Sequence, residues 1–402
     1  MDQNSGELQM NNYSYENSIN ESIENNTSVY VPYDIPDCPA KSSLVILYDL
    51  PEYIIEGVFM YTPTDKVMIS TVLPIFTVIG LLTNFAFLLT VVRVREMRTL
   101  TNFYLTNLAC ADLMFIIAAG FNIFINIYGT RSLIGVIHGS ATECVITYTS
   151  PSIPFFASTL LVTLIGIERF LAICFPLKHR MVNNKSRAIK LVIVTWVTAF
   201  ALGCVVAPGA GKHELLCVIW PEKYQYRLPT IVNFCSPSLY EYLDIASSCQ
   251  FAPFIVALVL NTALYALIIR RLSMRDVSET GDGKANQQSQ AQKVRNSVAR
   301  MLVINGIAFF LCLIPFQFIQ MYYVLARNFQ ISLDDKHMYI VQWVGKCLNV
   351  LNSAINPLIY SACNARYRQA FFTAIGCSAK KLRQSTERST GARNTTITNT
   401  KL

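Results

Sequence analysis

Long runs of apolar residues, separated by short polar segments, follow one another along the chain from residue 66 onward. A helix needs about 20 apolar residues to cross the hydrocarbon core of a bilayer, and only helices or closed barrels satisfy their backbone polar groups there. The runs therefore predict an all-α membrane protein, a bundle of seven transmembrane helices. The predicted spans are Val67–Val92, Phe103–Tyr128, Cys144–Cys174, Ala188–Ala207, Tyr242–Ile269, Met301–Ala326 and Met338–Ala362.

The composition agrees with lipid as the solvent for much of the chain. Of the 402 residues, 52% are hydrophobic and only 14% are charged, whereas a soluble globular domain carries about 25% charged residues. The twelve cysteines include no pair at zinc-ligand spacing. The sequence has no basic stretch interleaved with aromatic residues, so nucleic acid is excluded as a partner.

Basic residues lie mainly on one side of the predicted membrane. They follow the first, third, fifth and seventh spans, at Arg93, Arg95, Arg98, Lys178, Arg180, Lys185, Arg187, Arg270, Arg271, Arg275, Arg366 and Arg368. By the positive-inside rule, the amino terminus is expected outside the cell and the carboxyl terminus inside. The expected location is the plasma membrane.

The polar amino-terminal segment is a separate region from the membrane domain, which is expected over residues 66–363. Residues 1–65 hold eleven acidic residues and one basic residue. They predict an extracellular tail glycosylated at N-x-S/T triplets. The candidate glycosylation sites are Asn12, Asn20, Asn25 and Asn26.

Asp112 lies deep inside the second span. A charged side chain at the bilayer centre costs about 2.5–3.5 kcal/mol on insertion scales, so such a residue is a functional candidate by default. Other spans supply polar partners that together predict a hydrated centre able to hold a small cation. These partners are Asn84, Ser158, Asn352, Ser353 and Asn356. The alternative is a protonated carboxyl group that is hydrogen-bonded within the core.

Two prolines indicate the hinges of a switch, and one charged pair closes the third span. Pro315 and Pro357 interrupt the sixth and seventh spans, where proline removes a backbone hydrogen bond and kinks a helix. Kinks on adjacent helices are typical of hinges, although a single kink is often only structural. Glu168 and Arg169 close the third span, where the arginine could alternatively be an interfacial anchor.

Several motifs resemble those of the rhodopsin-like G-protein-coupled receptors over residues 65–377. They are GLLTN, LACAD, ERFLAICFPLKHR, the mid-membrane Pro315 and NPLIY. The resemblance implies a receptor and not an enzyme. It implies an extracellular ligand, a heterotrimeric G protein and arrestin as partners, and membrane lipid as surroundings.

The resemblance also implies roles for particular residues. Arg169 would engage the G protein after release from Glu168, and Tyr360 would swing inward on activation. The family's sodium pocket corresponds to Asp112, Ser158, Asn352 and Asn356, so an allosteric sodium ion is the one expected metal or cofactor. The segment NARYRQAFFTAIGC, residues 364–377, resembles the amphipathic eighth helix, with Cys377 as a candidate palmitoylation site. Residues 378–402 are expected to be a disordered cytoplasmic tail.

Three positions depart from the family pattern. Leu313 stands where an aromatic residue usually precedes the sixth-span proline, and Asn261 stands where many members have tyrosine. Arg295 occupies a position where an acidic residue would lock Arg169. Activation is therefore expected to be easier or to rely on other contacts.

The ligand is expected to be a neuropeptide. Amine receptors carry an aspartate where this chain has Pro151, and the motifs around Pro151 and Pro154 look most like invertebrate FMRFamide-type receptors. Receptors of the thyrotropin-releasing-hormone or neuromedin type, a non-peptide ligand and, in another class, a membrane transporter are the alternatives. The candidate pocket residues, each equally explained by packing, are Tyr148, Ser152, Phe155, Gln317, Gln320 and Gln342.

Lys346 is a lysine in the middle of the seventh apolar span and is placed in the outer half of the cavity by its helical spacing from Ser353. It is expected to receive an acidic group of the ligand, or else to pair internally with Glu143 or Glu214. A disulfide is predicted between Cys144 and Cys217; Cys235 is the alternative partner of Cys144, and would otherwise pair with Cys38.

Overall fold

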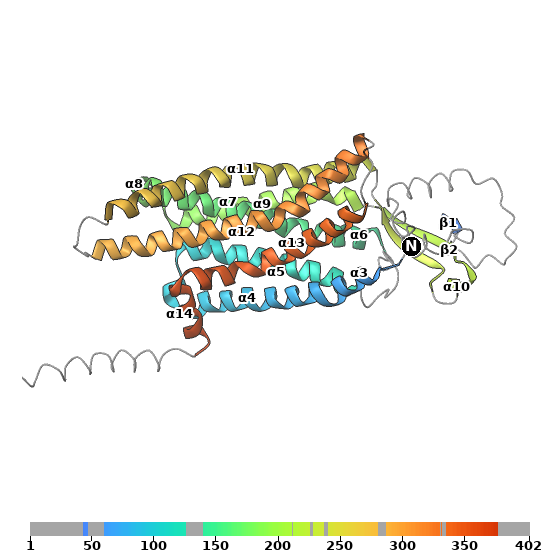
Figure 1. Cartoon of the computed structure of the whole chain (residues 1–402), viewed down its shortest axis with the longest axis horizontal. Helices are drawn as coiled ribbons and strands as arrows, with labels where there is room; N and C mark the ends of the chain where they lie inside the picture. The colour runs from blue at the N-terminus through green and yellow to red at the C-terminus, as the bar shows by residue number, and fades with distance from the viewer. Residues whose placement is uncertain are drawn as a thin grey trace, which may run out of the picture.

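The computed structural model describes residues 43–46, 60–125, 140–210, 212–225, 228–236, 240–279, 287–329, 331 and 335–376. Long helices run side by side along the long axis of this part of the chain (Figure 1). Six of them are long and apolar enough to cross a membrane: Pro63–Arg93, Leu100–Gly120, Ala141–Cys174, Lys185–Val206, Tyr242–Met274 and Arg295–Phe329. The seventh, α13 (Asp335–Cys363), is more polar and packs against α12 (Gln287–Phe329) and α4 (Leu73–Arg93). The predicted seven-helix membrane bundle is confirmed.

Two of the predicted spans are built from shorter pieces. The first begins as α3 (Pro63–Val67), continues as the π-helix η1 (Met68–Val72) and then becomes α4. The third consists of α6 (Ala141–Thr149) and α7 (Ser152–Cys174). Pro151 lies at the break between α6 and α7, because proline has no N–H to continue the helical hydrogen bonding.

The remaining long helices are α5 (Leu100–Ile125), α9 (Lys185–Val206) and α11 (Tyr240–Glu279). Both α11 and α12 extend about ten or more residues beyond the predicted apolar spans. Hydropathy detects only the part of a helix that lies in lipid, so the polar extensions of α11 and α12 could not be predicted from it.

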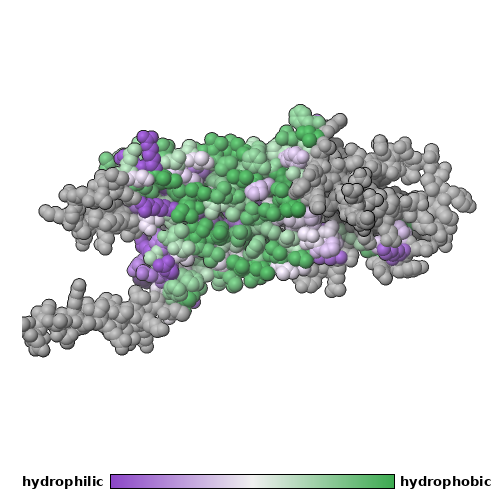
Figure 2. All heavy atoms as spheres, viewed as in Figure 1, coloured by the Kyte–Doolittle hydropathy of each residue, from purple (hydrophilic) through white to green (hydrophobic). Residues whose placement is uncertain are grey.

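The outer surface of the bundle is apolar and its centre is polar. Leu82, Val197 and Val256 are each more than 60% exposed, whereas Asn84 and Asp112 are fully buried. Figure 2 shows hydrophobic residues across the middle of the bundle, with hydrophilic residues gathered at the end that carries α8 (Pro176–Val182) and α14 (Ala365–Ala374). Such a continuous apolar surface is what lipid requires.

A three-stranded sheet lies at the end of the bundle opposite α14 (Figure 1). Its strands are β1 (Ser43–Ile46), β2 (Lys212–Ile219) and β3 (Ile231–Ser236), in the order β1-β2-β3. The β2 and β3 strands form an antiparallel pair, and β1 adds in parallel to β2. The pattern of the sequence predicts no strand in this region. A small apolar cluster of Val218, Trp220, Tyr224, Leu228 and Val232 supports the sheet.

The sheet is tied to the bundle by a disulfide between Cys144 and Cys235, whose Cα atoms are 5.7 Å apart. The predicted pairing of Cys144 with Cys217 is therefore wrong, and the alternative partner is the observed one. In the register of the hairpin, Cys235 lies opposite His213, which is four residues from Cys217 along β2. That separation is about 13 Å along a strand, so both cysteines cannot face Cys144. Cys217 is itself in a disulfide.

The short helix expected after the seventh span is present as α14 and folds back on the bundle. Its Tyr367 donates a hydrogen bond from its hydroxyl to Oδ1 of Asn102 on α5, at 2.5 Å. Arg93 donates to the Ala374 carbonyl at 2.8 Å. Burial raises the pKa of Tyr367 to about 12, so the phenol stays protonated and keeps its donor. The candidate palmitoylation site Cys377, the tail 378–402 and the candidate glycosylation sites lie outside the described residues.

Candidate functional site

The polar centre predicted around Asp112 is assembled in the structure from four helices. Asn356 on α13 donates from Nδ2 to Oδ2 of Asp112 at 2.7 Å, and the Ser158 hydroxyl on α7 lies 3.3 Å from Oδ1. Asn84 on α4 donates to the Ser353 carbonyl at 2.7 Å. Two of the sequence-predicted partners, Asn356 and Ser158, therefore contact the Asp112 carboxylate.

Three buried amide oxygens in this polar centre have no hydrogen-bond donor within the described part of the chain. They belong to Asn84, Asn352 and Asn356. Oxygen atoms are the ligands that hard cations prefer, and an unpaired buried acceptor is costly. No three His, Cys, Asp or Glu side chains of the described residues cluster as a metal site. A cation here would thus be held by one carboxylate together with amide and hydroxyl oxygens.

Tyr360, one of the expected switch residues, is buried in aromatic packing. Pro315 and Pro357 both lie within continuous helices, α12 and α13. Tyr360 is 1% exposed and contacts Phe87 edge-on, with ring centroids 5.4 Å apart. Its ring also packs against the ring of Tyr367 of α14, with the two centroids 5.8 Å apart. The side chain of Tyr360 therefore connects α13, α4 and α14.

Glu168 and Arg169 have different partners from those that the family resemblance implies. Glu168 is almost fully buried and pairs with Arg187 at the start of α9, at 2.6 Å. His179 of α8 lies 3.4 Å from its other oxygen. Arg169 donates to the Thr101 hydroxyl on α5 at 2.5 Å. In this structure Arg169 is thus restrained by α5, and there is no Glu168–Arg169 ion pair to release.

The charge of Glu168 is balanced by Arg187 and not by His179. Burial lowers the pKa of the His179 imidazole below its ordinary value, although the nearby Glu168 carboxylate acts in the opposite direction. Since an unperturbed histidine titrates near about pH 6.5, His179 is neutral at pH 7. Arg187 was counted in the sequence only as one of the bases that follow the third span, so its partner was not predicted.

Lys346 lies near the sheet end of α13, with its ammonium 4.8 Å from the centre of the Trp343 ring. This is a cation–π contact. The acidic charge that acts on it is Asp65, not Glu143 or Glu214; Glu214 instead pairs with Lys212 at 2.5 Å. The expected internal pairs of Lys346 are therefore wrong.

Both carboxylate oxygens of Asp65 already accept hydrogen bonds from other residues. Its Oδ1 accepts from the Tyr339 hydroxyl at 2.7 Å and from the Trp343 indole at 2.9 Å. Its Oδ2 accepts from both the backbone and the hydroxyl of Thr62 at 2.9 Å. Asp65 thus fixes Trp343, and it leaves the Lys346 ammonium without an ion pair in the described part of the chain. In the sequence Asp65 looked like one more acid of the tail.

The other candidate pocket residues are distributed over α6, α7, α12 and α13. Ser152 is buried and accepts a hydrogen bond from Gln250 of α11 at 3.1 Å, and Phe155, one turn further along α7, is also buried. Gln317 is 1% exposed, and neither polar atom of its side chain has a partner within the described chain. Tyr148 is exposed, and Gln320 and Gln342 are half-buried.

Two further contacts were not foreseen. Arg327 of α12 pairs with Asp244 of α11 at 2.6 Å and joins these helices near the sheet end. Asn261 of α11, one of the departures from the family pattern, donates to the Thr163 hydroxyl of α7 at 2.8 Å. One turn further, Tyr265 fills the space where Gly306 of α12 has no side chain.

Sequence comparisons identify the family. Residues 83–360 match the family described as 7 transmembrane receptor (rhodopsin family). The chain is 30% identical over 329 residues to the thyrotropin-releasing hormone receptor of Homo sapiens. The aligned region covers 75% of this chain and 76% of that receptor. The chain is also 29% identical over 327 residues to the growth hormone secretagogue receptor type 1 of Sus scrofa, and this alignment covers 78% of the chain and 82% of that receptor.

The resemblance to receptors of the thyrotropin-releasing-hormone type, the second expectation, is thereby supported, and the FMRFamide-type resemblance is not confirmed. A match over the greater part of the membrane domain also disfavours the transporter alternative. The chain belongs to the rhodopsin family of 7 transmembrane receptors, a family of receptors and not of enzymes.

Proposed function

We propose that the chain is a receptor for an extracellular peptide and that it activates a heterotrimeric G protein at the α14 end of the bundle. Its amino terminus lies outside the cell, because the basic residues concentrate at the α8 and α14 end. The relatives named above carry the names of a hormone and of a hormone secretagogue. Arrestin is a further expected partner at the α14 end.

The observation that carries this proposal is the construction of the sheet end. The β2–β3 hairpin is held next to α6 by the Cys144–Cys235 disulfide. Charged groups of three helices lie at the same end: Lys346 of α13 and the Asp244–Arg327 pair of α11 and α12. Charges of both signs and a hairpin at one end offer backbone and side-chain contacts that suit an extended peptide better than a small apolar molecule.

A peptide panel applied to cells that express the chain tests the proposal. The panel holds amidated neuropeptides, thyrotropin-releasing hormone and peptide growth hormone secretagogues. We expect a saturable second-messenger response to at least one peptide, absent from untransfected cells. A response confined to non-peptide ligands would remove the peptide part of the proposal.

We expect a sodium ion at Asp112 to favour the resting receptor. The unpaired oxygens of Asn84, Asn352 and Asn356 support this expectation. A ligand shifts a conformational equilibrium only by its differential affinity for the two states. Replacing potassium by sodium at constant ionic strength should therefore weaken agonist binding severalfold, and Asp112→Asn should abolish that dependence. Equal sodium sensitivity of parent and variant would end the sodium hypothesis.

We expect Lys346 to bind an acidic group of the peptide. Asp65 is saturated, so the ammonium keeps its capacity for a further anion. For an acidic peptide, Lys346→Met should reduce potency by roughly 10- to 100-fold, which corresponds to the free energy of one hydrogen bond to a charged group. Lys346→Arg is the matched variant that keeps the charge. If Lys346→Met affects the acidic peptide and its neutral analogue equally, Lys346 is structural.

A further inference from the structure

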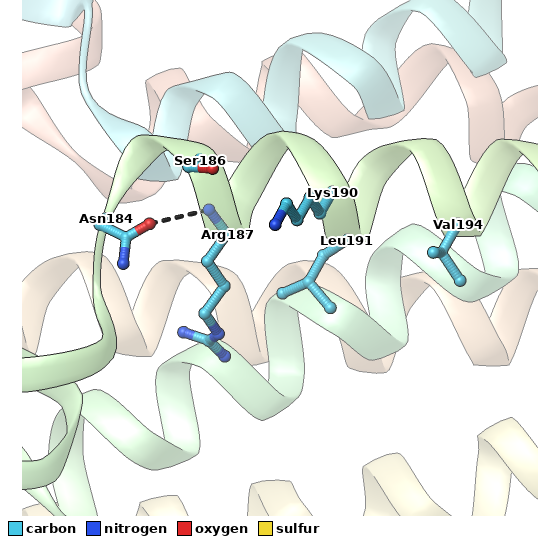
Figure 3. Close-up of a pocket in the computed structure, with 6 residues that line it drawn as sticks. All are labelled: Asn184, Ser186, Arg187, Lys190, Leu191 and Val194. Carbon is cyan, nitrogen blue, oxygen red and sulfur yellow. Dashed lines mark hydrogen bonds between the residues drawn. The ribbon is translucent and has the colours of Figure 1, made fainter.

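A pocket of about 360 Å³ lies at the start of α9, away from the Asp112 centre and from the sheet end. Figure 3 shows its lining along the first turns of α9, where the Asn184 side chain caps the backbone N–H of Arg187. The lining changes character along the helix. Its first part is polar or basic and its last part is apolar: Asn184, Ser186, Arg187, Lys190, Leu191 and Val194.

The charges in this pocket favour an anion. Lys190 is exposed and makes no ion pair with any residue in the described ranges. Arg187 uses two of its nitrogens, one for Glu168 and one for the Val182 carbonyl. A guanidinium has five N–H donors in a planar fork, so Arg187 keeps donors for a phosphate while it holds Glu168.

The apolar part of the pocket continues into the lipid-facing surface of α9. This helix, Lys185–Val206, is one of the six that are long and apolar enough to cross a membrane. Beyond the pocket, Ile193, Val197 and Phe200 are all more than half exposed. A soluble anion would use only the basic part of this surface. A molecule with an anionic head and apolar chains matches both parts, with its head at the level where the span begins.

We propose that this pocket binds the phosphate headgroup of an anionic phospholipid of the inner leaflet, with the acyl chains along the exposed apolar side of α9. The leaflet assignment rests on the orientation given under the proposed function. Lys190 and Arg187 contact the phosphate, and the Ser186 hydroxyl donates to it.

The site adjoins the third span through Arg187. Arg187 bridges the lipid phosphate and Glu168 of α7 with different nitrogens, so a bound phosphate adds a second anion to the same guanidinium. Bound lipid is therefore expected to hold the start of α9 against the end of α7.

Binding is measured with the full chain in nanodiscs, without ligand or G protein, so that failure here leaves the receptor proposal standing. The nanodiscs contain phosphatidylcholine alone or with a fluorescent phosphatidylinositol bisphosphate. Lys190→Ala removes a cation without touching the Arg187–Glu168 pair. Arg271→Ala, an exposed cation at the same end on α11, is the matched control. Native mass spectrometry of the released protein counts the lipids retained.

We expect Lys190→Ala to lower the affinity for the anionic lipid about fivefold, which corresponds to the free energy that one lysine contributes near an anionic surface. Arg271→Ala should leave the affinity for the α9 pocket unchanged. Free inositol trisphosphate should compete at least tenfold more weakly than the lipid, since it lacks the acyl chains. Equal affinities of the parent and Lys190→Ala would overturn the proposal. Equally strong competition by the free inositol phosphate would overturn the lipid assignment.

Discussion

Arg169→Ala is expected to reduce agonist-driven nucleotide exchange by roughly 100-fold, the upper range of coupling between two sites in one protein. Peptide affinity should stay within about threefold, because Arg169 lies at the far end of a span whose apolar core measures about 30 Å. The measurement is guanine nucleotide exchange on a purified G protein, paired with peptide binding to the same membranes.

The structure supplies a matched variant for this prediction. Arg169 donates to the Thr101 hydroxyl, and Thr101→Val removes that acceptor while keeping the shape of the side chain. If the bond restrains Arg169 in the resting receptor, Thr101→Val should raise exchange in the absence of agonist. Near-normal agonist-driven exchange by Arg169→Ala would refute its role as the residue that engages the G protein.

Cys235→Ser is expected to lower the stability of the purified receptor and to abolish peptide binding. The disulfide closes a loop with a sequence separation of 91. On the chain-entropy account such a loop contributes about 4–5 kcal/mol at most. Without the bond, the β2–β3 hairpin loses its covalent tie to α6. Thermal unfolding and surface binding of labelled peptide measure the two effects.

Cys144→Ser should have the same effect as Cys235→Ser, and the double variant should be no worse than either, since both remove one bond. Cys204→Ser, which removes an exposed free cysteine of α9, is the control and should behave like the parent. Additive losses in the double variant, or a non-reducing peptide map that joins Cys144 to another cysteine, would contradict the observed pairing.

The seven helices and the polar centre could be predicted from the sequence, for physical reasons that are easy to state. Lipid admits few polar groups, so apolar runs mark spans and a lone carboxylate such as Asp112 marks a special site. Its partners Ser158 and Asn356 were predicted as polar side chains of other spans, in agreement with the family motifs. The structure confirms that these side chains meet.

The features that the sequence could not predict depend on the register of the paired strands and on the direction in which side chains point. The choice between Cys217 and Cys235 depends on how β2 pairs with β3, which spacing alone does not reveal. The partner of Glu168 is an arginine on another helix, reached by a flexible side chain. Asp65 looked like a solvated acid of the tail, although it is buried under Tyr339 and Trp343.

In this receptor, peptide binding at the sheet end is expected to control G-protein activation at the Arg169 end. The most direct test uses the purified chain in nanodiscs with a purified heterotrimeric G protein and the peptide selected by the cell panel. We expect nucleotide exchange to rise with peptide concentration and to saturate, and bound G protein in turn to raise peptide affinity. Arg169→Ala should remove both effects. Saturable peptide binding to the parent chain that leaves nucleotide exchange at its basal rate, with every G-protein class supplied, would contradict this coupling.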